Sequence, residues 1–354
     1  MPTLHGVGHA STWYTEVMPR LRRVDCAGAG IVRSRRGRGF TYRWADGRTV
    51  TEPDVLARIH DLVLPPAWQD VWICPWPNGH IQAVGTDVAG RRQYRYHDRW
   101  REQRDRAKHD QVLLVARRLP RARVTVAEHL VLPGYPRERV LAAAFQLLDL
   151  GFFRIGSEEY ADENGSYGLA TIRREHVSLD GGAVVFDYPA KNGKQRIQHL
   201  ADENLRAVVK GLLRRRDDQP ELLAYRRARR WTDVRSDDVN AYLRQVIGVD
   251  ATAKDFRTWH ATVLMAVALA VSREVADSPG KRRRAVARGY REVADYLGNT
   301  AAVARASYVD PRIMDLYDDG RTVLGALERA TRDGGDGPFL HGTVERAVLR
   351  LLTS

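Results

Sequence analysis

Cysteine and long apolar runs are both scarce in this sequence. Only Cys26 and Cys74 occur among 354 residues, too few for a disulfide framework or a cysteine-rich zinc site. The longest apolar stretch, residues 261–271, has about half of the roughly 20 residues that a bilayer-spanning helix needs. The N-terminal residues also lack the basic and then apolar pattern of a secretory signal. We therefore expect no transmembrane span and a location in a reducing cytoplasm.

Lysine is scarce too, although the chain is strongly basic. Lys and Arg together number 57 against 44 Asp and Glu, which gives a net charge of +13. Arginine supplies most of this charge, because there are only six lysines: Lys108, Lys191, Lys194, Lys210, Lys254 and Lys281. Arginine does not deprotonate in proteins, whereas lysine can donate and recover a proton. Lys191, Lys194 and Lys254 are therefore candidates for chemistry.

The excess of positive charge indicates a polyanionic partner. Nucleic acid is the leading candidate, because phosphate neutralisation by Lys and Arg supplies most of the affinity of nucleic-acid-binding proteins. An anionic membrane surface is the alternative, but no strongly basic amphipathic anchor stands out, so we expect no membrane partner. Hydrophobic residues make up 44% of the chain and charged residues 29%, which is typical of a globular protein.

The sequence pattern changes near residue 105. Residues 20–100 contain short strand-like runs that Gly, Pro and Asp separate, which predicts a β-rich N-terminal domain over residues 1–105. The charged stretch over residues 100–109 is either a linker or a solvated helix. Apolar residues at helical spacing dominate after it, which predicts a mainly helical domain over residues 106–354, with buried helices over residues 140–148 and 258–271.

Residues 177–200 interrupt the predicted helices with strand-like runs. They contain two turn signals, Asp180-Gly181 and Asn192-Gly193, and so predict a small three-stranded β meander. Asn-Gly favours a type I′ turn, which would place Lys191 and Lys194 on either side of a hairpin tip. Arginine clusters at residues 214–216, 226–230 and 281–288 are either solvated helix faces or phosphate-binding stripes.

The familiar motifs of phosphate, metal and serine chemistry are missing. The sequence has no P-loop, no G-x-S-x-G and no H-E-x-x-H, so ATP and metal dependence lose support. A set of basic residues followed by a tyrosine remains, and this set suits phosphodiester transesterification. The tyrosine oxygen attacks phosphorus, fixed cations stabilise the charge on the nonbridging oxygens, and a lysine protonates the departing sugar oxygen. The set comprises Arg154, Lys191, Lys254, Arg257 and Tyr308.

The motifs around these residues resemble, in order along nearly the whole chain, those of the type IB DNA topoisomerases of bacterial and poxvirus type. The N-terminal matches are GRGFTYR (37–43), residues 64–87 and GRRQYRYH (90–97). The C-terminal matches are FFRIGSEEY, YGLATIRREHV, AKNGK, KDFRTWHAT and LGNTAAVARASYVDP. The resemblance implies an α+β protein in which a small β-rich N-terminal domain precedes a mainly helical catalytic domain with the fold shared by these topoisomerases and the tyrosine recombinases.

The resemblance also implies the catalytic roles. Tyr308 would form a 3′-phosphotyrosyl link and leave a 5′-hydroxyl, while Arg154 and Arg257 would hold the scissile phosphate in the bidentate geometry that guanidinium groups favour. Lys191 would protonate the 5′-oxygen leaving group. Lys254 would assist it, and lies three residues before Arg257, hence on the same helical face.

Asn299 stands where many relatives have histidine, so a neutral amide would bind a nonbridging oxygen. Asn299 and Tyr308 are nine residues apart. In one straight helix they would lie about 13 Å apart along the axis and on opposite faces, because each residue adds about 1.5 Å and about 100°. Both could not then contact one phosphate. We therefore predict a break or bend between Gly298 and Tyr308.

In the N-terminal domain, the resemblance implies that one strand enters the major groove of DNA. Gln93 of this strand would bind a base edge, and Tyr94 and Tyr96 would pack beside it from one face. Tyr160 matches a family position near the DNA backbone. Three further candidates are interpreted as structural or solvent-exposed residues: His176, His260 and Lys194.

The implied activity is relaxation of supercoiled double-stranded DNA by a monomer, without ATP, metal or another cofactor, in the cytoplasm at the nucleoid. A tyrosine recombinase is the alternative enzyme, but Lys254 stands where recombinases usually carry histidine, and they have no counterpart of GRRQYRYH. A noncatalytic DNA-binding protein is the second alternative. Replacement of Tyr308 by phenylalanine separates an enzyme from a noncatalytic binder, because only an enzyme has activity to lose.

Overall fold

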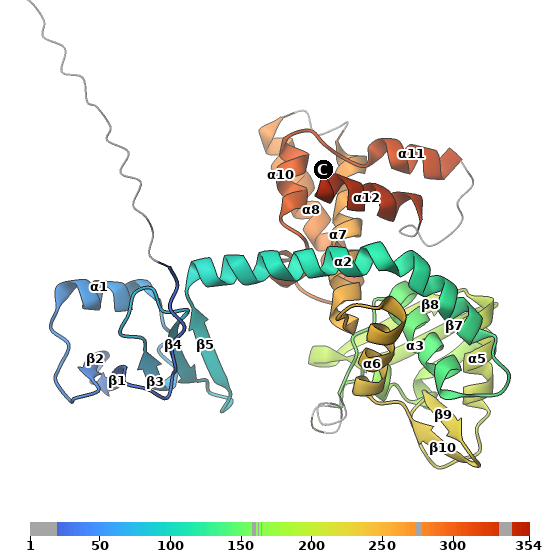
Figure 1. The fold of residues 1–354 in the computed structure, drawn as a ribbon, viewed down its shortest axis with the longest axis horizontal. Helices are drawn as coiled ribbons and strands as arrows, with labels where there is room; N and C mark the ends of the chain where they lie inside the picture. Colours follow the sequence, from blue (N-terminus) through green and yellow to red (C-terminus); the bar gives the residue numbers. More distant parts are fainter. Residues whose placement is uncertain (1–19, 158–160, 162, 164, 274–277, 333–341) are drawn as a thin grey trace, which may run out of the picture. The chain divides into compact units, whose positions relative to one another are not determined.

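The computed structural model describes residues 20–157, 161, 163, 165–273, 278–332 and 342–354 (Figure 1). Contacts within the chain divide it into two compact units, Met1–Ala107 and Lys108–Ser354. A β-rich N-terminal part is followed by a mainly helical part with small antiparallel sheets. The predicted α+β class is therefore confirmed. Within the described residues, no helix combines the length and apolar character that a membrane crossing requires.

The N-terminal unit is built on one antiparallel sheet with the strand order β2-β1-β3-β4-β5. Its core forms because alternate strand residues face inward, as shown by buried Ile31 beside exposed Val32. Helix α1 starts with Pro53 in its first turn and adds Ile59 to this core. The elements are β1 (Ile31–Arg36), β2 (Gly39–Trp44), α1 (Pro53–Asp61), β3 (Gln69–Ile73), β4 (Ile81–Thr86) and β5 (Arg92–Tyr96).

The charged stretch around residue 105 is helical. It opens α2 (Asp98–Leu130), and residues 101–107 are exposed to solvent. Of the two interpretations, the solvated helix is therefore confirmed and the linker is not. Beyond His109 the same helix buries Val112, Ala116 and Leu119, which recur at helical spacing and enter the core of the C-terminal unit.

Helix α7 (Ala253–Ser272) is the central helix of the C-terminal unit (Figure 1). It is apolar on most of its circumference, as expected for a buried helix, and contacts α3, α6, α8 and α10–α12. The predicted buried helices over residues 140–148 and 258–271 are confirmed in α3 and α7. The other helices are α3 (Arg137–Gly151), α5 (Glu203–Leu213), α6 (Ser236–Ile247), α8 (Pro279–Leu297), α9 (Ala301–Ser307), α10 (Arg312–Asp318), α11 (Leu324–Arg332) and α12 (Thr343–Thr353).

The predicted three-stranded meander is confirmed as β6 (Val177–Asp180), β7 (Ala183–Ala190) and β8 (Lys194–Leu200). The prediction of a type I′ turn is wrong. Ala190 pairs with Lys194, so the loop holds three residues, and they form the 3-10 turn η3 (Lys191–Gly193). Gly193 supplies the single left-handed conformation, with φ of +67°, that this loop length requires. Lys191 thus lies in the loop, whereas Lys194 opens β8 and is exposed.

Two of the three arginine clusters do not lie on helices. Residues 226–230 belong to an unpredicted hairpin of β9 (Ala224–Arg227) and β10 (Arg230–Asp233). Residues 214–216 follow α5. Arg215 is only 6% exposed, and its guanidinium donates hydrogen bonds to the carbonyls of Leu222 and Glu221. The helical interpretation holds for residues 281–288, which lie in α8.

Candidate active site

Arg154 lies in the loop that follows α3. The loop is fixed by backbone hydrogen bonds to the 3-10 turn η1 (Leu169–Thr171): the Leu169 N–H donates to the Arg154 carbonyl at 2.7 Å. Gly168 allows the close approach, since a Cβ there would lie 2.5 Å from the Gly156 Cα. Glycine at this position therefore sets where the Arg154 backbone lies.

Arg257 and Lys254 lie in the first turns of α7. The helix begins after Thr252, whose N–H and hydroxyl both donate to the Asp255 carboxylate. Arg257 is 4% exposed, and its guanidinium donates to the Phe152 carbonyl and, at 2.8 Å, to the Leu297 carbonyl. These contacts join α7 to the Arg154 loop and to the end of α8.

Tyr308 lies immediately after α9, and a break in the chain's helical structure separates α9 from α8. Helix α8 ends at Leu297, Gly298 takes the left-handed conformation with φ of 62°, and α9 starts after Thr300. The Thr300 hydroxyl accepts a hydrogen bond from the Val303 N–H at 3.3 Å and so caps the new helix. The predicted break is therefore confirmed, and it removes the geometric conflict between Asn299 and Tyr308.

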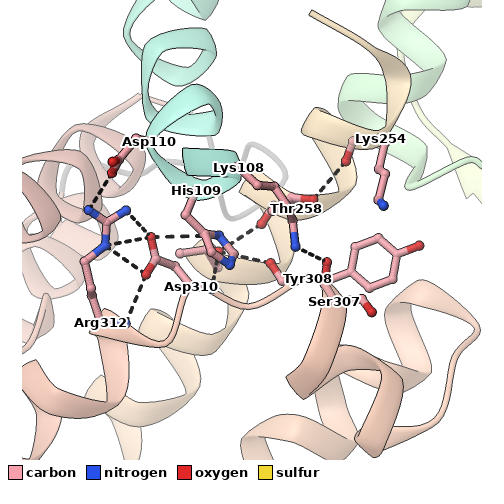
Figure 2. A network of polar contacts seen from close by, with 10 residues as sticks. Lys108, His109, Asp110, Lys254, Thr258, Ser307, Tyr308, Asp310 and Arg312 are labelled. Carbon is pink, nitrogen blue, oxygen red and sulfur yellow. Dashed lines mark hydrogen bonds and ion pairs between the residues drawn. The ribbon is translucent and has the colours of Figure 1, made fainter. Parts of the chain in front are cut away.

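The structure brings all six predicted catalytic residues of the C-terminal unit together. A cavity of about 330 Å³ is lined by Arg154, Lys191, Lys254, Arg257 and Tyr308. A neighbouring cavity of about 210 Å³ shares Arg154, Lys191 and Arg257 and adds Asn299. Figure 2 shows the Lys254 side chain extending toward the Tyr308 ring. Residues from one loop, one hairpin and three helix ends thus meet at one place.

The environment of Tyr308 favours its phenolate. Tyr308 is 8% exposed, and burial alone would raise the pKa of the phenol, but Arg257, Arg154 and Lys254 together hold that pKa below its usual value. The Arg257 guanidinium carbon lies 5.3 Å from the centre of the Tyr308 ring. Burial and the neighbouring Arg154 lower the pKa of Arg257 to about 10, so it remains charged at neutral pH. The cavity can therefore stabilise negative charge on both a tyrosine oxygen and a bound anion.

Arg154 holds the Asn299 side chain. Its Oδ1 accepts a hydrogen bond from the Arg154 guanidinium. Its amide nitrogen is buried and makes no hydrogen bond to another described residue. A buried donor without a partner is costly, so an anion in the adjoining cavity is a suitable acceptor for it.

The proposed DNA-contacting residues of the N-terminal unit lie on β5. Tyr94 and Tyr96 share one face as predicted, with ring centroids 5.9 Å apart and planes inclined by 19°. Tyr94 is 42% exposed, and the Gln93 amide donates to the Asp87 carboxylate at 2.9 Å. Tyr160 lies outside the described residues.

Two histidines have the structural positions predicted for them. His260 is 1% exposed in α7, where it lies 3.4 Å from the Asp149 carboxylate. His176 caps a turn by accepting from the Arg173 N–H at 3.2 Å, and burial lowers its pKa. Among the described residues, no group of three or more His, Cys, Asp or Glu could hold a metal ion.

Sequence reasoning missed Arg196 of β8. Its guanidinium donates to the carbonyls of Asp295 and Tyr296 at the end of α8, directly before Gly298 and Asn299, and it lines the smaller cavity. Burial lowers its pKa. The available signal was strand alternation, which puts Arg196 and Lys194 on one face of β8.

This assembly of cations around a buried tyrosine is suited to chemistry on a phosphodiester. The family model for the catalytic core of eukaryotic DNA topoisomerase I matches residues 97–324, and the model for the N-terminal domain of bacterial DNA topoisomerase IB matches residues 39–87. The chain therefore belongs to the type IB DNA topoisomerase family, and its substrate is DNA.

Named relatives agree with the family models. DNA topoisomerase 1B of Acanthamoeba polyphaga mimivirus is 28% identical over 298 residues, which are 82% of this chain and 88% of the relative. DNA topoisomerase 1B of Vaccinia virus and DNA topoisomerase I of Monkeypox virus are each 21% identical over 253 residues, 71% of this chain and 76% of each relative. The similarity thus extends over most of both chains.

Proposed function

We propose that this enzyme relaxes supercoiled duplex DNA through a transient covalent bond between Tyr308 and one strand. The Tyr308 phenol gives its proton to solvent water, and its oxygen attacks the scissile phosphorus. The bond between phosphorus and the 5′-oxygen breaks, which leaves a 3′-phosphotyrosyl link and a free 5′-hydroxyl. Attack of that hydroxyl on the phosphotyrosine reverses the step and restores the strand.

Each cation has a separate role in this step. Arg154 and Arg257 hold the nonbridging oxygens, where negative charge accumulates in the transition state. Lys191 gives its proton to the departing 5′-oxygen, and Lys254 assists it. The free Asn299 amide nitrogen donates to a nonbridging oxygen. The lowered pKa of Tyr308 supports its role as nucleophile.

Relaxation occurs while the strand is open, because the free 5′ end can rotate about the intact strand. No ATP is consumed, since one phosphodiester is exchanged for another of similar energy. We propose that no metal takes part, because the side-chain cations stabilise the transition-state charge. The enzyme acts as a monomer on nucleoid DNA in the cytoplasm.

Duplex recognition is assigned to the N-terminal unit. Gln93 reads a base edge in the major groove, Tyr94 and Tyr96 pack beside it, and Tyr160 of the C-terminal unit lies near the DNA backbone. The exposed position of Tyr94 on an edge strand supports this assignment. The net charge of +13 supports binding to the phosphate backbone.

One observation carries the proposal: four cations and Tyr308 line a single cavity although they come from separate parts of the chain. The test is incubation of the protein with supercoiled plasmid in excess EDTA without nucleotide. We expect relaxation, and a denaturant-stable adduct between DNA and the peptide that contains Tyr308. Supercoils left intact by a folded preparation contradict the proposal.

The matched variants are Tyr308→Phe and Tyr317→Phe. Tyr317 is 4% exposed, and its hydroxyl has no hydrogen-bond partner among the described residues, so its removal leaves the fold intact. Tyr308→Phe abolishes relaxation but retains DNA binding, whereas Tyr317→Phe retains both. Relaxation by Tyr308→Phe at the wild-type rate assigns the nucleophile elsewhere.

A further inference from the structure

Lys108 is one of the six lysines, and the proposed chemistry does not use it. It lies in α2, near the start of the C-terminal unit, and its Nζ donates a hydrogen bond of 2.8 Å to the Ser307 carbonyl (Figure 2). Ser307 is the last residue of α9 and directly precedes Tyr308. The last carbonyls of a helix lack partners within it and carry partial negative charge, which a cation satisfies. Lys108 therefore binds the C-terminal end of the helix that presents Tyr308.

The chain is also fixed on the other side of Tyr308. The Asp310 N–H donates to the Thr262 hydroxyl of α7 at 3.0 Å. The Asp310 carboxylate is buried and accepts hydrogen bonds from the Arg312 guanidinium, which in turn reaches Asp110 of α2 at 2.9 Å (Figure 2). His109 of α2 lies 3.9 Å from the Asp310 carboxylate. Side chains of α2 thus contact the chain both before and after Tyr308.

We propose that Lys108 is a positioning residue that holds the Tyr308 backbone in the place from which its phenol attacks the phosphate. This inference rests on the proposed role of Tyr308. Helix α9 has only seven residues and follows the break at Gly298, so the Asn299–Ser307 connection alone gives Tyr308 little rigidity. The contact with Lys108 is made to the backbone, so it fixes the segment without depending on the Ser307 side chain.

The positioning role differs measurably from a contact with DNA phosphate. A phosphate-binding lysine weakens binding when it is removed, and reduces the salt dependence of the affinity by about one charge. A positioning lysine leaves affinity and salt dependence unchanged and lowers the rate of the chemical step, because small displacements of a nucleophile cost up to about 100-fold in rate.

The experiment compares Lys108→Ala, Lys108→Arg and the control Lys210→Ala, which removes the same charge from an exposed position on α5. Single-turnover cleavage is measured with a duplex that cannot be religated, and affinity is measured over a range of salt concentrations. We expect Lys108→Ala to lower the cleavage rate about 10- to 100-fold with unchanged affinity. Lys108→Arg can still donate to the carbonyl and restores most of the rate, and Lys210→Ala behaves as wild type.

Two outcomes overturn the inference. One is a wild-type cleavage rate for Lys108→Ala, and the other is a loss of affinity with a reduced salt dependence that accounts for the lower rate. Asp110→Asn provides a second variant, since it weakens the attachment after Tyr308, and we expect a smaller reduction in rate. The adduct site separates the two proposals: an adduct on Tyr308 with no effect of Lys108→Ala rejects only the positioning role. Absence of a Tyr308 adduct in the wild type rejects the nucleophile itself.

Discussion

Replacement of Arg257 by methionine tests how the site activates its tyrosine. Methionine fills much of the same volume, so the main change is loss of a buried positive charge beside Tyr308. If the 5.3 Å from the guanidinium carbon to the ring centre is taken as the charge separation, the Coulomb energy at an effective dielectric constant of about 20 is about 3 kcal/mol. This corresponds to about two pKa units.

The sign follows from the charges. Arg257 stabilises the phenolate, so its removal raises the pKa of Tyr308, and the remaining burial acts in the same direction. The rising limb of the pH–rate profile therefore moves to higher pH by about two units, and cleavage at neutral pH falls at least about 100-fold. The proposed contact of Arg257 with the scissile phosphate is also lost, which lowers the rate further.

Two measurements check this prediction. The Tyr308 titration is obtained as the absorbance difference between each protein and its Tyr308→Phe counterpart, and cleavage is followed in single turnovers across pH. Arg305→Met is the matched control, because Arg305 of α9 is exposed and lies 5.9 Å from a different ring, that of Tyr290. An Arg257→Met protein with an unchanged Tyr308 titration and pH profile refutes the reasoning.

Three other predictions address stability, loop geometry and DNA reading. Arg123→Met leaves the buried carboxylates of Asp149 and Glu345 without the guanidinium that joins them, and we expect a loss of about 3–5 kcal/mol in the free energy of unfolding, measured by denaturant titration. Gly168→Ala forces its backbone away from the loop that carries Arg154 and Gly156; we expect a loss of about 1–3 kcal/mol in stability and slower cleavage, and unchanged values for both would contradict the close packing. Gln93→Ala should reduce discrimination between duplexes by about 1–3 kcal/mol at the contacted base pair in competition binding, whereas an equal loss for all sequences would exclude base reading.

Much of the fold could be predicted from local pattern. Alternation and turn residues gave the β-rich N-terminal part, helical spacing gave α3 and α7, and the turn signals gave the meander of β6–β8. The hairpin of β9 and β10 was missed because its arginine-rich strands have no apolar alternation. The three-residue loop at η3 was missed because pairing of Ala190 with Lys194 depends on the register of the whole hairpin.

Arginine clusters show the limit of composition. Arg215 looks like any other charged residue in this basic chain, yet it is buried and donates hydrogen bonds to backbone carbonyls. Burial depends on which segments pack around a side chain, and residues far away in the chain supply them. The scarcity of lysine was more informative, because Lys191 and Lys254 both line the cavity with Tyr308.

The sequence by itself determined the family, the types of residue available for chemistry and the need for a break before Tyr308. These follow from composition, motif order and the fixed geometry of a helix. Only the tertiary structure decided that the cations meet around one phenol, that its pKa is lowered and that Lys108 binds the carbonyl beside it. The physical reason is that charge interactions and hydrogen bonds depend on distance and burial, which long-range packing sets.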